Sequence, residues 1–185
     1  MEKIKKQTLF ITHTGLMLAL LLGVQFVTRP FGQFVTGSLV NLILLTSLFI
    51  IGKSSGMTVG ALSPFLAFFV GIGPALPQVI PFMAVGNVLL VLVASFVSKH
   101  MAKHNKRDII FTTIGLIAAS LAKFLFLWVG LVIIALPLIP GIKEQQVTML
   151  SAAFSWPQLV TALIGSSLAM LVVPLLKRAK VGSQD

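Results

Sequence analysis

Residues 108–136 read DIIFTTIGLIAASLAKFLFLWVGLVIIAL, and after Asp108 this stretch contains a single charged residue, Lys123. A helix needs about 20 mostly apolar residues to cross the hydrocarbon core of a bilayer, and this stretch is longer than that. It therefore predicts a transmembrane helix, and the expected class is an integral membrane protein.

Further apolar runs lie on both sides of this stretch. The expected membrane spans are residues 9–28, 37–51, 57–72, 78–98, 108–136 and 151–176. No internal repeat and no long polar linker interrupts them, so we expect one all-α domain over residues 1–185, a bundle of six transmembrane helices. The N-terminal MEKIKK and the apolar run after it look like a signal peptide, but no small-residue cleavage site follows. We expect this run to stay as the first helix.

The composition is typical of a protein whose surface faces lipid. Of the 185 residues, 57% are hydrophobic and 10% are charged, whereas soluble domains carry about 25% charged residues. A soluble domain of this length has too little interior to bury so much apolar sequence. Much of the apolar surface must therefore contact the lipid bilayer.

The basic residues indicate which ends of the spans face the cytoplasm. With six spans and a cytoplasmic N-terminus, the outer loops hold only Arg29 and Lys143, and Lys123 lies within a span. The other eleven of the 14 basic residues are then on the inner side: Lys3, Lys5, Lys6, Lys53, Lys99, Lys103, Lys106, Arg107, Lys177, Arg178 and Lys180. This bias predicts that both termini are cytoplasmic. It also explains the net charge of +10 without nucleic acid, which is not an expected partner.

The sequence lacks the residue patterns of several functional classes. The absence of cysteine excludes disulfides, thiolate metal sites and thiol nucleophiles. There is no phosphate-binding Gly-rich loop and no metal-binding cluster of His or carboxylate residues. We therefore expect no enzyme activity, no catalytic residue, no metal and no cofactor.

Lys123 is the most informative single residue. It lies 15 positions after Asp108, which places it roughly 22 Å along a helix that runs outward. A charge at this depth costs several kcal/mol unless it meets water, a partner or an anionic ligand. Two interpretations stay open: Lys123 contacts a ligand, or its side chain extends to the outer membrane surface.

Uncharged polar residues lie in or beside the same outer half of the spans. Asn41, Asn87 and Gln78 could bind a small polar ligand through hydrogen bonds, although such side chains more often join one helix to another. A further polar cluster surrounds the first outer loop: Gln25, Arg29, Gln33 and Thr36.

Two tryptophans are expected near the outer surface. Trp128 and Trp156 fit the aromatic belts of membrane proteins, and either ring could also pack against a ligand. The segment 154–158, which opens the last span, could line an outward cavity.

Gly15 and Ala19 form a small-xxx-small pair on one face of the first span. Such a pair lets another helix approach closely.

Together these features resemble the substrate-binding S-components of energy-coupling-factor (ECF) vitamin transporters, which are prokaryotic plasma-membrane proteins. Three stretches carry the resemblance: residues 11–19, residues 33–41 (QFVTGSLVN), and residues 71–77 (GIGPALP) through Pro81 to Gly86 and Asn87.

The resemblance implies a mechanism. An S-component captures a vitamin in an outward cavity and docks through its first helix on a membrane coupling subunit. Two ATPase subunits, which are separate chains, then power a toppling that opens the cavity inward. Gly15 and Ala19 match the docking motif, which usually has alanine at both positions.

The stretch 33–41 looks most like pantothenate-specific S-components. This ligand is physically compatible with the polar residues, because Lys123 or Arg29 could meet its carboxylate. Its amide and hydroxyl groups would suit Asn41, Asn87 and Gln78. Hydroxymethylpyrimidine, pyridoxine and folate remain alternative ligands, and Trp128 or Trp156 would suit a ring. A stand-alone facilitator or channel is the alternative function.

Overall fold

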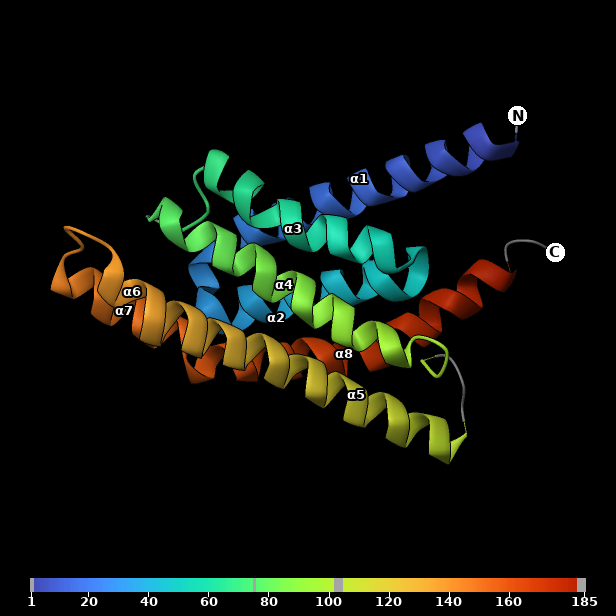
Figure 1. Ribbon diagram of the computed structural model, residues 1–185. Helices are drawn as coiled ribbons and strands as arrows, with labels where there is room; N and C mark the ends of the chain where they lie inside the picture. Colours follow the sequence, from blue (N-terminus) through green and yellow to red (C-terminus); the bar gives the residue numbers. More distant parts are fainter. Residues whose placement is uncertain (1, 75, 102–104, 183–185) are drawn as a thin grey trace.

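The computed structural model describes residues 2–74, 76–101 and 105–182 and consists of helices packed side by side (Figure 1). Helix accounts for 90% of the structure, and the described residues contain no strand. The expected all-α class is confirmed.

The helices follow one another in a simple order, in which η denotes a 3₁₀ or π segment. They are α1 (Glu2–Thr28), η1 (Arg29–Phe31), α2 (Gly32–Thr46), η2 (Ser47–Ile51), α3 (Lys53–Phe69), η3 (Pro77–Val79), α4 (Ile80–Ala94), η4 (Ser95–Val97), α5 (Lys106–Leu125), η5 (Phe126–Ala135), α6 (Leu136–Leu138), α7 (Glu144–Phe154) and α8 (Trp156–Gly182).

Four helical segments among the described residues are long and apolar enough to cross a bilayer: Ile4–Ile51, Pro77–Val97, Lys106–Leu138 and Glu144–Ala179. The first has 48 residues, which would measure about 72 Å as a straight helix. It instead folds back at η1, so that α1 and α2 pack against each other (Figure 1). Pro30 and the positive φ of 81° at Gly32 mark this turn.

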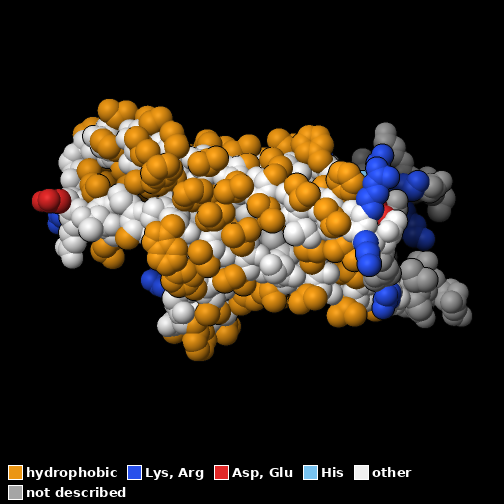
Figure 2. Space-filling view, turned by 90° about the horizontal axis from the view of Figure 1, so that it is seen from below, with side chains coloured by type: hydrophobic (Ala, Val, Ile, Leu, Met, Phe, Trp, Pro, Cys, Tyr) orange, Lys and Arg blue, Asp and Glu red, His pale blue; other side chains and the backbone are white. Residues whose placement is uncertain are grey.

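The flank of the molecule is apolar and its two ends differ. Figure 2 shows hydrophobic side chains over the flank and a gathering of Lys and Arg at one end. Exposed hydrophobic residues occur on several helices, for example Phe69 at 80%, Phe96 at 78% and Leu171 at 67%. The basic end carries both chain termini (Figure 1) and the starts of α3 and α5. This distribution is that of a membrane protein.

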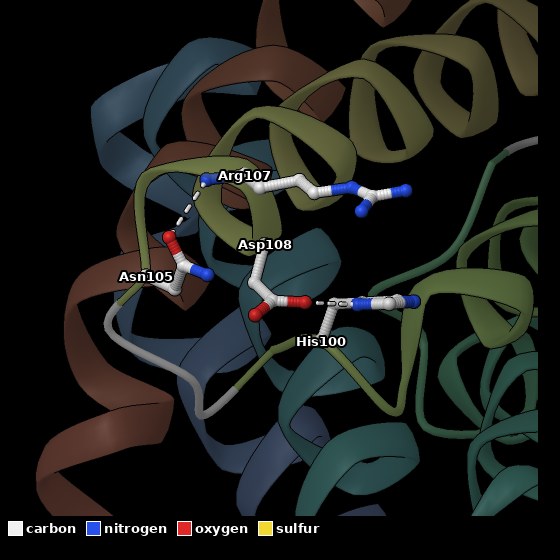
Figure 3. A network of polar contacts seen from close by, with 4 residues as sticks. All are labelled: His100, Asn105, Arg107 and Asp108. Atoms are coloured by element: carbon white, nitrogen blue, oxygen red, sulfur yellow. Dashed lines mark hydrogen bonds and ion pairs between the residues drawn. The ribbon is translucent and has the colours of Figure 1, made fainter.

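A network of polar contacts joins α5 to the turn that follows η4, at the basic end (Figure 3). The side chain of Asn105 caps α5 by accepting a hydrogen bond from the Arg107 N–H at 3.4 Å. In the same region, Nδ1 of His100 pairs with the carboxylate of Asp108 in the first turn of α5. The Arg107 guanidinium lies 5.6 Å from the ring centroid of Phe111. These contacts fix where the Lys123 helix begins.

The last expected span, residues 151–176, does not begin where predicted. The backbone breaks at Ser155 (φ −92°, ψ −137°), so that residues 151–154 belong to α7 and the remainder to α8. The cause is Pro157, which lacks the N–H that a continuous helix would require. The second helix also begins earlier than predicted, at Gly32 rather than Gly37.

Helix α2 lies at the centre of the bundle and packs most extensively on α8. The two backbones approach closely at Gly165, where an added Cβ would lie 2.6 Å from Cβ of Asn41 and 2.7 Å from the Ser38 carbonyl oxygen. Only glycine fits there, because no larger residue avoids the backbone of α2. The position of Asn41 is therefore fixed by the packing of α8.

Candidate ligand-binding cavity

Lys123 lies in the interior of the bundle with its side chain 4% exposed. Its Nζ donates hydrogen bonds to Oδ1 of Asn41 at 2.7 Å and to Oδ1 of Asn87 at 2.8 Å. One side chain thus joins α2, α4 and α5. The interpretation in which Lys123 extends to the outer membrane surface is wrong, because the amine is held inside by these two amides.

Asn87 also connects this group to α3. Its Nδ2 donates to the Gly60 carbonyl oxygen at 3.3 Å. A Cβ at Gly60 would lie 3.3 Å from the Asn87 backbone and side chain, so the absence of a side chain there permits the close approach of α3 and α4. Asn87 therefore serves helix packing as well as the lysine, as polar residues in membrane helices commonly do.

A cavity of about 390 Å³ adjoins these three residues, which is at the small end of the ~300–1,000 Å³ typical of small-molecule sites. It is lined from α1, α2, α3, α4, α5, η5, α7, α8 and the loop before η3. The lining residues are Gln25, Gln33, Thr36, Gly37, Val40, Asn41, Ser63, Pro64, Ala67, Ile72, Gly73, Pro74, Met83, Asn87, Lys123, Leu127, Met149, Leu150, Ala153, Phe154 and Gln158.

Lys123 is the one charged side chain among these lining residues, and no Asp or Glu is among them. An ammonium group has three N–H donors. Two of them meet Asn41 and Asn87, and the hydrogen bonds of the described residues include no protein acceptor for the third. A buried cation without a counter-ion attracts an anion strongly, because the low-dielectric surroundings screen its charge poorly.

The break between α7 and α8 determines which side chains lie at the α7 end of the cavity, which we call its roof. In a continuous helix the N–H of residue 157 would bond to the Ala153 carbonyl, but Pro157 has no N–H. Two side chains satisfy this carbonyl oxygen instead. Gln33 Nε2 of α2 donates to it at 2.5 Å, and Gln158 Nε2 of α8 donates at 3.4 Å. The proline thus brings two cavity-lining amides to one place.

Four residues expected at the site do not line this cavity. Gln78 is exposed and borders a separate shallow pocket with Phe82 and Leu138. The two tryptophans face outward: Trp128 is 39% exposed and stacks on Phe124 at 5.9 Å, and Trp156 is 60% exposed with its ring 5.6 Å from that of Phe34.

Arg29 is the fourth of these residues, and it acts on the cavity wall from outside. Its Nη1 donates to the Gly71 carbonyl oxygen at 3.2 Å. The next three residues, Ile72, Gly73 and Pro74, line the cavity. Arg29 therefore ties the turn between α1 and α2 to the loop that borders the cavity.

Sequence reasoning missed several lining residues. Met149 and Leu150 belong to α7, which no predicted span anticipated as a separate element. Pro157, which lies inside the last predicted span, could have revealed the break before α8. Ser63, Pro64 and Met83 also line the cavity, and nothing in the sequence distinguishes these three from ordinary packing residues.

The small-residue pair of α1 lies on the surface. Gly15 and Ala19 are both exposed, and a Cβ added at Gly15 would have no atom within 4 Å. Leu16 and Leu20 beside them are 63% and 49% exposed. This face of α1 is free to receive another helix.

One comparison with known proteins identifies a family. The model of the family described as ECF transporter, substrate-specific component, matches residues 16–177. The match covers all of the cavity-lining residues. No curated protein and no solved structure matches the sequence significantly.

Replacing Asn41 by Asp tests whether Lys123 lacks a counter-ion. The substitution is nearly isosteric and gives the lysine a carboxylate at the position of the amide oxygen, so we expect the ligand-free protein to become more stable. A charge-assisted bond gains about 1–2 kcal/mol over a neutral one, which corresponds to roughly 2–8 °C in apparent Tm. Thermal unfolding of purified Asn41→Asp in detergent measures this. Gln145→Glu, which adds the same charge at an exposed position of α7, should leave Tm unchanged, and a lower Tm in Asn41→Asp alone would contradict the interpretation.

Proposed function

We propose that this chain, which belongs to the ECF transporter substrate-specific component family, captures pantothenate from outside the cell and delivers it inward. The observation that carries the proposal is Lys123, the single charge of an otherwise uncharged cavity. The family consists of transporter subunits rather than enzymes, and its members work with ECF module subunits and a small-molecule substrate.

The charge of the cavity favours pantothenate among the vitamins considered. Pantothenate has one carboxylate, and Lys123 offers one buried cation to meet it. Pyridoxine and hydroxymethylpyrimidine lack a carboxylate and would leave the lysine unneutralised. Folate has two carboxylates and would bring a second negative charge to a cavity with one cation. Asn41 and Asn87, held against Lys123, position the amine for the ligand.

We propose a six-span topology with both termini in the cytoplasm. The six spans would be α1, α2 with η2, α3, α4 with its flanking 3₁₀ turns, α5 with η5, and α8, while α7 covers the cavity. The basic residues gather at one end (Figure 2), and both termini lie at that end (Figure 1). By the positive-inside rule this is the cytoplasmic end. The cavity then opens toward the outside, in a prokaryotic plasma membrane.

The exposed face of α1 is the proposed docking surface for the membrane coupling subunit. Gly15 and Ala19 present no bulk there, so a partner helix can approach the backbone. ATP would be hydrolysed by two ATPase subunits, which are separate chains. Docking at the outside of α1 leaves the cavity, which lies on its inner side through Gln25, free to hold its ligand.

Removing the charge of Lys123 should abolish pantothenate binding. Lys123→Met keeps an unbranched side chain of similar length and loses the cation. We therefore expect affinity to fall at least about a hundredfold, because a buried charge pair contributes several kcal/mol. Equilibrium titration of the purified variant measures this. Asn41→Asp supplies a folded second variant, in which the internal carboxylate competes with the ligand for Lys123 and should also weaken binding. Unchanged affinity in both variants would disprove charge pairing at this site.

Bulk on α1 should block assembly with the ECF module and spare ligand binding. In Gly15→Leu/Ala19→Leu the two side chains would hold a partner helix away from the backbone. We expect co-purification with the coupling and ATPase subunits to be lost while pantothenate affinity stays at the wild-type value. Leu171→Ala, on an exposed position of α8, is the control and should assemble normally. Normal assembly of the double variant would place the docking surface elsewhere.

A further inference from the structure

Gln25 of α1 has a buried oxygen with no partner. Its Oε1 is shielded from solvent and accepts no hydrogen bond within the described part of the chain. Two other buried side-chain oxygens share this property, on Ser98 and Thr112, but of the three residues only Gln25 lines the cavity. A buried acceptor left unpaired costs about 1–3 kcal/mol. A ligand that donates a hydrogen bond to this oxygen would therefore gain affinity.

The polar residues around Gln25 already have partners. Gln33 and Gln158 donate to the Ala153 carbonyl oxygen. Thr36 Oγ1 donates to the Thr28 carbonyl oxygen at 2.9 Å and accepts from the Thr28 hydroxyl at 3.0 Å. These contacts hold the turn and the roof in place. Among the described residues that line the cavity, Gln25 alone has a side-chain polar atom that is both shielded from solvent and unpaired. A rotation of its side-chain amide would present this oxygen to a bound molecule.

Gln25 and the lysine group lie at different depths in the cavity. Gln25 is three residues before the end of α1, and Asn41 is nine residues after the start of α2. The two helices meet at the turn η1, so a rise of about 1.5 Å per residue places Gln25 roughly 5 Å and Asn41 roughly 14 Å from that turn. The two polar sites are therefore separated along the cavity by roughly 9 Å.

The wall that borders the cavity between these levels is largely apolar. Val40, Leu127 and Phe154 line the cavity and are buried. A ligand that spans both sites thus passes a hydrophobic wall, where a methyl-bearing or methylene chain is favoured over a polar one.

We infer that the cavity recognises its ligand at two ends. Lys123 binds a carboxylate, and Oε1 of Gln25, at the end near the turn η1, accepts a hydrogen bond from a hydroxyl or N–H donor of the ligand. The inference rests on the proposed function, because it assigns a second specificity-determining residue to the same site. It defines a substrate class, namely small monocarboxylates with an apolar middle and a hydrogen-bond donor at the opposite end. Gln25 favours carboxylates that carry this donor, because the donor pairs an oxygen that otherwise stays unpaired.

Pairs of simple acids test this class without assuming the natural ligand. Each pair is an unbranched alkanoate of four to eight carbons and the same acid with a terminal hydroxyl, titrated calorimetrically against the purified protein. We expect the wild type to bind the hydroxy acid about tenfold more tightly at the best chain length, the value of one hydrogen bond. In Gln25→Met, which keeps the side-chain volume, the preference should disappear while the parent alkanoate binds as before. Gln145→Met, at an exposed position, should keep the preference.

The outcomes separate this inference from the proposed function. Pantothenate binding that Gln25→Met leaves unchanged, or a hydroxyl preference that survives in this variant, would overturn the role of Gln25 and leave the proposed function standing. A hydroxyl preference that requires Gln25, in a protein that does not bind pantothenate, would support the inference and reject pantothenate as the ligand. A folded protein that binds neither pantothenate nor any of these acids would overturn both.

Discussion

The amine of Lys123 lies between the amide oxygens of Asn41 and Asn87, and Asn87 in turn bonds to the backbone of α3. Four helices are thereby tied to one buried cation. An ammonium in a membrane interior costs several kcal/mol unless it is satisfied, and two neutral amides supply hydrogen bonds but no counter-charge. The fold therefore holds an incompletely compensated charge beside a cavity, an arrangement that favours an anionic ligand.

The two ends of the bundle have different structural features. At one end, basic side chains and the Asn105 cap start α5 (Figure 3) and set the depth at which Lys123 lies. At the other end, the break at Ser155 turns α7 over the cavity, and the freed Ala153 carbonyl collects Gln33 and Gln158. A single proline, Pro157, thus shapes the roof. Membership of a transporter family agrees with the presence of a cavity at this end.

The sequence predicted the all-α class and singled out three residues that the structure brings together beside the cavity. Lys123, Asn41 and Asn87 were recognisable because a polar side chain in an apolar run must find a partner, and here they are one another's partners. Trp128, Trp156 and Gln78 were expected at the site but do not line the cavity, because helix phase decides which way a side chain points. The π segment η5 (Phe126–Ala135) changes that phase just after Lys123, and periodicity in the sequence does not reveal such a change. The contribution of α7 depends on a helix break, which hydropathy also fails to show.

The most direct test of the charge-based account compares pantothenate with pantothenol, its alcohol, in which a hydroxyl replaces the carboxylate. Both would be titrated against the purified wild-type protein, without ATP or partner subunits. The account predicts submicromolar binding of pantothenate and at least about a hundredfold weaker binding of pantothenol, a difference near 3 kcal/mol. Equal affinity for the two, or no affinity for pantothenate in a protein shown to be folded, would contradict it.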